Sequence, residues 1–303
     1  MQNRQLIAIA GLAATIAFAA MSVVRLAGTE SDPPFISGGQ FEASGVVSVP
    51  GSQGVLFVDD SQRQQIFWME MAPDGTQVGG VTPVALGADV MDPEGITANS
   101  THFFVVGSQS KPTGSEGDGL ARFRFDRTSR RVSGVERITG LKGWLAGKVA
   151  ELRGFEGRSG DDALNIEGLA WDPAGQRLLL GLRSPVVDGQ ALIIPLSLIN
   201  PAAAFTTTNL RVDGGKAIRL ALGGAGIRSI EYDQVAKAFQ VIAGDEGKRD
   251  WRLVEWNGQA PGTLREVTTF AKHLKPEGVA RAMLQGRPVR VIVFDTSRVS
   301  VFN

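Results

Sequence analysis

From residue 42 onward, short runs of apolar residues alternate with segments rich in turn-forming residues, and one arrangement recurs five times. Each copy predicts a first strand headed by a single polar residue, a tight turn, a strongly apolar second strand and a third strand, often with a fourth. The second strands are almost continuously apolar: VLFV, FFVV, LLLGL, FQVIA and VIVF. Such strands are expected where both faces of a sheet are covered.

Repeats of about 40 to 50 residues with four strands each are typical of propeller blades. We therefore predict an all-β fold, a β-propeller of five blades. A sixth blade would fit if the insertion Gly140–Asp162 contained a degenerate one, although Lys142–Leu152 has apolar residues at helical spacing. The fifth copy ends after its third strand, so the N-terminal segment Phe35–Phe41 is predicted to close the ring. A β-sandwich fits the strand content but not the recurring first-strand motif, and a doubly wound α/β fold would need more helical segments.

The polar residue that begins each copy is the main candidate for function. The first strand of each blade lines the axis of a propeller, so residues at equivalent positions should converge there. Glycine follows most of these residues, which suits a position where neighbouring backbones are crowded. The five lead residues are Ser44, Glu94, Glu167, Glu231 and Glu277.

A second set of polar residues closes each apolar second strand and should face the mouth of the ring. The candidates for ligand binding among these and the neighbouring basic residues are Asp59, Ser108, Arg183, Arg228, Asp245 and Asp295.

Several carboxylates on one axis cannot remain uncompensated. Two carboxylates about 7 Å apart repel by roughly 2.4 kcal/mol at an effective dielectric of 20. Arginine or lysine partners, retained protons or a bound cation must relieve this repulsion. Arg183, Arg228 and Lys275 lie beside the motifs, and a hard cation such as Ca²⁺ would suit carboxylate ligands from Glu94, Glu167, Glu231 and Glu277. A purely structural role, in which these glutamates accept hydrogen bonds from the next blade, is the alternative.

Composition narrows the choice of chemistry. The chain has 303 residues, of which 43% are hydrophobic, and its 31 Lys and Arg residues balance 31 Asp and Glu residues. This neutrality gives no electrostatic reason to expect a nucleic acid or an anionic membrane as a partner. The absence of cysteine excludes disulfides and thiolate chemistry, and two histidines are too few for a multi-histidine zinc site.

The N-terminal segment predicts export. Residues 1–25 contain an uncharged run from Leu6 to Val24, which is typical of a signal peptide or a membrane anchor. Residues 26–39 read as a polar linker, and residues 40–303 as a single propeller domain. Both readings of the N-terminal segment place the domain in the periplasm or outside the cell, with membrane contact only through this segment. We expect a monomer.

The copies that begin DPEGIT, IEGLAWDPAGQRLLLGLRSP, GGAGIRSIEYD and KPEGVA resemble the bacterial family catalogued as domain of unknown function 3616. More distantly, the chain is similar to phytase-like esterase and calcium-dependent lactonase propellers. The latter resemblance implies that Glu94, Glu167 and Glu277 are metal ligands. The family resemblance implies a fold more than an activity.

Three functions are compatible with these observations. The first is an acidic axial site that binds a small ligand, with or without a divalent cation. The second is a metal-dependent ester or lactone hydrolase in which a carboxylate such as Asp245 acts as base. The third is a scaffold for envelope proteins. The sequence leaves open whether the protein is an enzyme.

Overall fold

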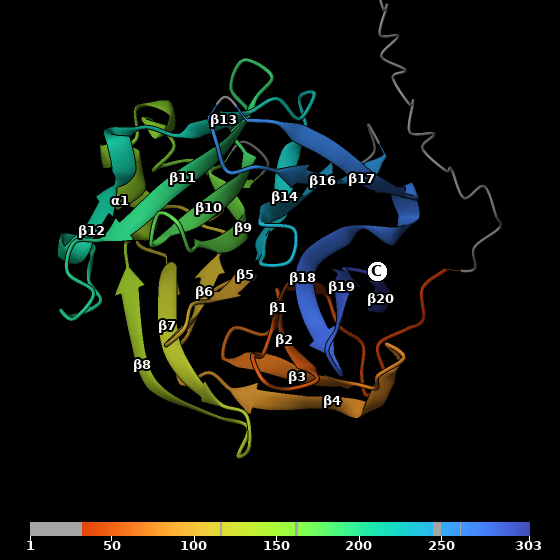
Figure 1. Cartoon of the computed structure of the whole chain (residues 1–303). Helices are drawn as coiled ribbons and strands as arrows, with labels where there is room; N and C mark the ends of the chain where they lie inside the picture. The colour runs from red at the N-terminus through yellow and green to blue at the C-terminus, as the bar shows by residue number, and fades with distance from the viewer. Residues whose placement is uncertain (1–31, 116, 161–162, 245–249, 261) are drawn as a thin grey trace, which may run out of the picture. The chain divides into compact units, whose positions relative to one another are not determined.

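The apolar strands predicted from the repeat form five antiparallel sheets in the computed structural model, which describes residues 32–303 except 116, 161–162, 245–249 and 261. The strands of each sheet follow chain order from the inner strand outward, except that the last two strands of blade 3 both pair with its third strand (Figure 1). The strands of the first three blades are β1 (Ala43–Ser48), β2 (Gly54–Asp59), β3 (Gln65–Met71), β4 (Gln77–Ala85), β5 (Pro93–Ala98), β6 (Phe103–Gly107), β7 (Gly119–Asp126), β8 (Arg131–Thr139), β9 (Asn165–Asp172), β10 (Arg177–Ser184), β11 (Ala191–Leu198), β12 (Leu210–Val212) and β13 (Ile218–Leu220). The last two blades contain β14 (Gly226–Asp233), β15 (Ala238–Gly244), β16 (Trp251–Trp256), β17 (Leu264–Phe270), β18 (Pro276–Leu284), β19 (Arg287–Phe294) and β20 (Arg298–Phe302).

The inner strands surround one axis. β1 contacts β5, β5 contacts β9, β9 contacts β14, β14 contacts β18, and β18 returns to β1. This closed order confirms the predicted five-bladed β-propeller. The compact unit that it forms extends from Pro33 to Asn303.

The hydrophobic core is divided among the five junctions between blades. Val47, Leu56 and Val105, for example, pack between blades 1 and 2, and Ile242, Leu253 and Ile292 pack between blades 4 and 5. Residues of the second strands are buried because a neighbouring sheet covers each of their faces. Each junction therefore needs apolar residues from two consecutive repeats.

The insertion after blade 2 contains helical structure, as its apolar spacing predicted, and no sixth sheet among its described residues. It forms α1 (Leu141–Lys148) and a 3₁₀ turn, η1 (Ala150–Leu152). Leu141 and Leu145 of α1 pack into the cluster between blades 2 and 3. Further 3₁₀ turns in the described part of the chain are η3 (Thr207–Asn209), η4 (Asp213–Gly215) and η5 (Lys272–Leu274).

The ring closes between blade 5 and the N-terminal segment. Blade 5 has three strands, and Phe35 forms an isolated antiparallel bridge with Arg298 of β20. The backbone N–H of Ile36 donates to Ser297 O, and that of Val299 donates to Pro34 O. Closure is thus made where it was predicted, by a bridge and flanking hydrogen bonds and not by a continuous strand, because residues 37–38 form a turn.

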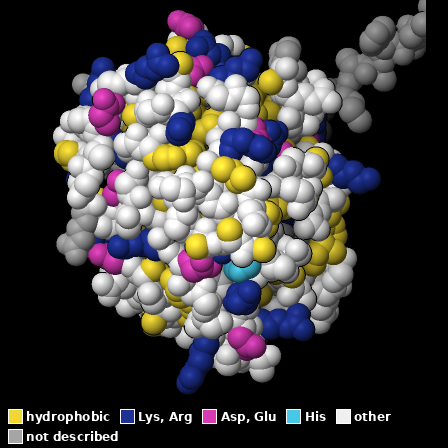
Figure 2. Space-filling view, turned by 90° about the vertical axis from the view of Figure 1, so that its left-hand side faces the viewer, with side chains coloured by type: hydrophobic (Ala, Val, Ile, Leu, Met, Phe, Trp, Pro, Cys, Tyr) yellow, Lys and Arg dark blue, Asp and Glu magenta, His cyan; other side chains and the backbone are white. Residues whose placement is uncertain are grey.

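The predicted signal peptide or anchor, residues 1–25, lies outside the described residues. Within the part of the chain that the structure describes, no helix is long and apolar enough to span a membrane. Figure 2 shows basic and acidic side chains both spread over one face of the molecule.

Candidate functional site

The lead residue of each blade sits at an irregularity of strand pairing. The register between the inner and second strands shifts across each of these positions. Such a bulge leaves one residue unpaired and re-aims its side chain. The residues at these shifts are Ser44, Glu94, Glu167, Arg228 and Glu277.

Blade 4 corrects the predicted set. The pairing of β14 with β15 shifts between Ile227 and Ser229, so Arg228, and not Glu231, is equivalent to the other lead residues. Glu231 lies three residues further along β14. Asp172 and Asp233, which end their strands and accept matching turn hydrogen bonds, reveal the correct register. The glutamate at position 231 is offset by three residues from this register, so it is not a lead residue.

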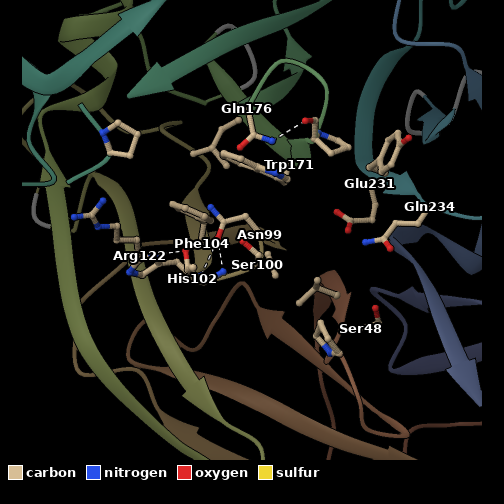
Figure 3. Close-up of a pocket in the computed structure, with 18 of the residues that line it drawn as sticks. Ser48, Asn99, Ser100, His102, Phe104, Arg122, Trp171, Gln176, Glu231 and Gln234 are labelled. Carbon is tan, nitrogen blue, oxygen red and sulfur yellow. Dashed lines mark hydrogen bonds between the residues drawn. The ribbon is translucent and has the colours of Figure 1, made fainter. Parts of the chain in front are cut away.

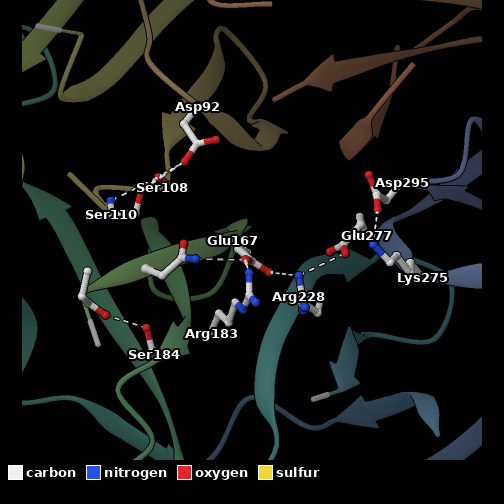
Figure 4. A network of polar contacts seen from close by, with 12 residues as sticks. Asp92, Ser108, Ser110, Glu167, Arg183, Ser184, Arg228, Lys275, Glu277 and Asp295 are labelled. Carbon is white, nitrogen blue, oxygen red and sulfur yellow. Dashed lines mark hydrogen bonds and ion pairs between the residues drawn. The ribbon is translucent and has the colours of Figure 1, made fainter. Parts of the chain in front are cut away.

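Arg228 neutralises the axis on the side of blades 3 to 5. Its Nη1 lies 3.0 Å from Glu167 Oε2 and 3.1 Å from Glu277 Oε1 (Figure 4). Arg183 Nη1 contacts the other Glu167 oxygen at 2.9 Å, and Asn165 Nδ2 donates to it at 3.1 Å. Glu167 and Arg228 are 3% and 6% exposed, so this ion pair network is buried. Buried charges require such pairing.

The carboxylates of blade 5 are only partly neutralised by basic residues. Lys275 Nζ lies 2.9 Å from Asp295 Oδ2. No described group donates a hydrogen bond to Glu277 Oε2, which is buried. Burial raises the pKa of Glu277 well above its usual value, Arg228 lowers it, and Glu167 and Asp295 raise it further. Glu277 is therefore an acid whose charged form is disfavoured by its surroundings.

Blades 1 and 2 contribute a cluster of carboxylates, which we call the acidic cluster: Glu42, Asp59, Asp60, Asp92 and Glu94. One carboxylate oxygen from each of Asp60, Asp92 and Glu94 lies within 4.8 Å of the others, and the same holds for Glu42, Asp59 and Asp60. Two charges at that distance repel by about 3 kcal/mol at an effective dielectric of 20. Three such pairs cannot persist without relief.

The pKa values express this repulsion. Burial, the hydrogen bond that protonated Asp60 donates to Glu42, and the charges of Glu42, Asp92 and Asp59 raise the pKa of Asp60 to about 8. Burial and the charges of Glu167, Asp92, Glu277 and Asp60 raise the pKa of Glu94 well above its usual value. Protons thus relieve the cluster when nothing else is bound.

The two sides of the axis differ in their counter-charges. Among the described residues, no lysine or arginine forms an ion pair with Asp60, Asp92 or Glu94. The acidic residues of blades 3 to 5 have Arg183, Arg228 and Lys275. The side of blades 1 and 2 therefore has a deficit of positive charge.

The other predicted ligand-binding residues differ in how exposed their side chains are. Asp59 is 2% exposed and accepts hydrogen bonds from Glu42 N and Ser61, and burial raises its pKa. Ser108 is 1% exposed and donates a hydrogen bond to Asp92, so it orients this carboxylate. Arg183 keeps 35% of its side chain exposed. Asp245 lies outside the described residues.

A cavity at the inner strands was not predicted. It lies at the opposite ends of these strands from the acidic cluster and has a volume of about 740 Å³. Glu231, Tyr232, Trp171 and Phe104 line it (Figure 3). Its residues come from strand ends and hairpin turns of several blades, which share no sequence motif.

Comparison with protein families matches residues 154–270 to the model described as "Protein of unknown function (DUF3616)". The match confirms the predicted resemblance over this segment, which includes the copy IEGLAWDPAGQRLLLGLRSP. None of the curated proteins matches the chain by sequence.

The solved structures that match this chain share little sequence with it. A protein of unknown function from Bacteroides thetaiotaomicron is 10% identical with a TM-score of 0.45, covering 89% of this chain and 72% of its own. The periplasmic gluconolactonase PpgL from Pseudomonas aeruginosa is 13% identical with a TM-score of 0.41, covering 85% and 70%. A glucose dehydrogenase is 13% identical with a TM-score of 0.43, covering 88% and 97%. At these scores, none of them assigns an activity to this chain.

Proposed function

We propose that the protein is a ligand-binding propeller whose acidic cluster holds a divalent cation, with Ca²⁺ as the best match. The observation that supports this is the deficit of positive charge: Asp60, Asp92 and Glu94 meet within 4.8 Å and have no basic partner among the described residues. A divalent cation would supply the charge that Arg183, Arg228 and Lys275 supply on the other side.

The donor set favours a hard cation. All of the side chains offer carboxylate oxygens, and Ca²⁺ takes six to eight oxygen ligands in flexible geometry. Asp60, Asp92 and Glu94 would hold the ion, and Ser108 positions Asp92 by donating a hydrogen bond to it. The remaining coordination positions would be filled by water or by oxygens of a small ligand.

An anionic or oxygen-rich small molecule fits this arrangement. The bound cation would attract its oxygens, and Arg183, with 35% of its side chain exposed, would offer a planar set of donors to a carboxylate or phosphate. The hydrolase alternative stays a prediction, because Asp245, the residue named as its candidate base, lies outside the described residues. The envelope-scaffold alternative also stays a prediction.

Thermal unfolding with and without Ca²⁺ tests the proposal. Saturation at about one hundred times Kd should stabilise the wild type by about 2.7 kcal/mol, which raises the Tm by roughly 5 to 10 °C. The stabilisation should grow as the pH rises toward 8, because the ion must displace the proton that Asp60 holds with a pKa of about 8.

Two variants complete this test. The double variant Asp60→Asn, Glu94→Gln should lose the calcium-dependent increase in Tm. Glu266→Gln, which removes an exposed carboxylate on β17, should keep it. Equal Tm values with and without Ca²⁺, Mg²⁺ and Mn²⁺ in the wild type would exclude a cation site, as would an unchanged shift in the double variant.

A further inference from the structure

The cavity at the far ends of the inner strands contains one carboxyl group that its surroundings hold in a defined orientation. The backbone N–H of Trp171 donates to Thr97 Oγ1 at 3.1 Å, and the Thr97 hydroxyl donates to Glu231 Oε2 at 2.9 Å. Thr97 is 0% exposed. Three neighbouring blades therefore fix Glu231, and Figure 3 shows its carboxyl group directed into the cavity.

Among the described residues, no lysine, arginine or histidine forms an ion pair with Glu231. Burial raises its pKa well above the usual value, and the charge of Asp233 raises it further, while the Thr97 hydrogen bond lowers it. A carboxyl group in this position either retains a proton or faces a cation supplied by a ligand.

The other charged residues of the cavity are already paired. Arg122 Nε lies 2.7 Å from Glu136 Oε2, and Arg281 Nε lies 2.8 Å from Asp233 Oδ2. Burial and the charges of Arg122 and Arg124 lower the pKa of His102, which favours a neutral imidazole. Glu231 is thus the lining residue whose carboxylate would have no counter-charge among the described residues.

Aromatic rings line the same cavity. Trp171 and Phe104 lie nearly parallel, with an interplanar angle of 2° and centroids 6.2 Å apart, and Tyr232 adjoins Glu231 on β14. The faces of such rings attract cations, and ammonium groups most strongly when these are removed from water. A volume of about 740 Å³ falls within the range of pockets that enclose small organic molecules.

We propose that this cavity is a second ligand site, distinct from the acidic cluster, and that it binds a small organic cation through Glu231 and the aromatic lining. The ligand class is an alkylammonium compound with polar substituents. Amide side chains of Asn99, Gln176 and Gln234, which also line the cavity, would take hydroxyl or carbonyl groups of such a molecule. A metal ion suits the site poorly, because one carboxyl group among aromatic rings offers too few oxygen ligands.

Choline and 3,3-dimethylbutan-1-ol form a matched pair of probes, since they share shape and hydroxyl group and differ in charge. Isothermal titration of the full-length protein should give an affinity for choline at least tenfold higher than for the neutral alcohol. Glu231→Gln, which keeps the size of the side chain and its hydrogen bond with Thr97, should reduce the affinity for choline to that for the alcohol. Trp171→Leu should lower the affinity for choline more than the affinity for the alcohol.

The outcomes separate this proposal from the cation proposal above. The double variant Asp60→Asn, Glu94→Gln should bind choline as the wild type does, because its substitutions lie at the other end of the inner strands. Failure of choline to bind, equal affinities for the two probes, or unchanged choline affinity in Glu231→Gln would each overturn the assignment and leave Glu231 a protonated structural residue. None of these results depends on whether Ca²⁺ binds.

Discussion

Arg228 changes the net charge of the side chains around the propeller axis. The equivalent positions of blades 2, 3 and 5 carry glutamate, and Arg228 contacts two of these glutamates through one nitrogen. Its guanidinium also lies over Trp251, 5.0 Å from the ring centroid. Without this cation, Glu167 and Glu277 would face each other as buried carboxylates. The arginine therefore stabilises blades 3, 4 and 5 against one another.

Arg228→Met should lower the free energy of unfolding by about 3 to 5 kcal/mol, because removing one member of a buried ion pair leaves uncompensated charge. Urea unfolding followed by circular dichroism measures this loss. Arg211→Met is the matched control: Arg211 is 62% exposed, and its pairing with Asp213 should contribute less than about 1 kcal/mol.

Adding Glu167→Gln and Glu277→Gln to Arg228→Met should restore part of the lost stability, since the buried charges disappear together. If Arg228→Met costs no more than Arg211→Met, the network does not stabilise the fold.

At the scale of the element, the inner strands need a small residue directly after the lead residue. A Cβ atom at Gly278 would lie 2.3 Å from Ser44 O and 2.9 Å from Val46 N of the next inner strand, and one at Gly45 would lie 2.7 Å from Glu94 O. Blade 4 has Ser229 here, and Val279 N–H donates to its hydroxyl oxygen at 3.2 Å. The glycines thus mark close approach of neighbouring blades.

Gly278→Ala should destabilise the protein by about 1 to 3 kcal/mol, the range for overpacking a well-packed site. Gly147→Ala in α1 is the control, because a Cβ atom there meets nothing within 4 Å, and alanine should stabilise the helix by up to about 1 kcal/mol. Denaturation midpoints of the two variants would then move in opposite directions. A Gly278→Ala midpoint equal to that of the wild type would show that the strands separate without cost.

At the scale of the whole molecule, closure of the ring depends on residues far apart in the chain. Phe35 pairs with Arg298, whose guanidinium lies 3.9 Å from the Phe35 ring centroid, and Ile36 is 2% exposed between blades 5 and 1. The N-terminal segment covers the edge of β20, which would otherwise offer unpaired backbone groups to other chains.

A chain that begins at residue 43 should therefore have a lower Tm than one that begins at residue 32. Burial of Ile36 alone contributes about 2 to 3 kcal/mol, so the difference should reach at least several degrees. The shorter chain should also aggregate more readily, because its β20 edge is open. Calorimetry and light scattering measure the two effects. Equal Tm values would mean that blade 5 closes the ring without this segment.

The sequence by itself determined the blade repeat and the lead positions of blades 1, 2, 3 and 5. Apolar runs such as LLLGL can be buried only between two sheets, and local turns connect the strands. It also indicated that acidic residues meet at the axis and that Arg183, Arg228 and Lys275 balance part of their charge.

Only the tertiary structure decided which residues share the axis. In blade 4 the residue at the axis is Arg228, three positions before the predicted Glu231. Strand pairing, and not the nearest glutamate, defines which residues of the blades are equivalent. Asp60, Asp92 and Glu94 meet across two blades, and the cavity of Glu231 gathers residues from several blades. Such contacts depend on how sheets are placed around a ring, which local patterns do not specify.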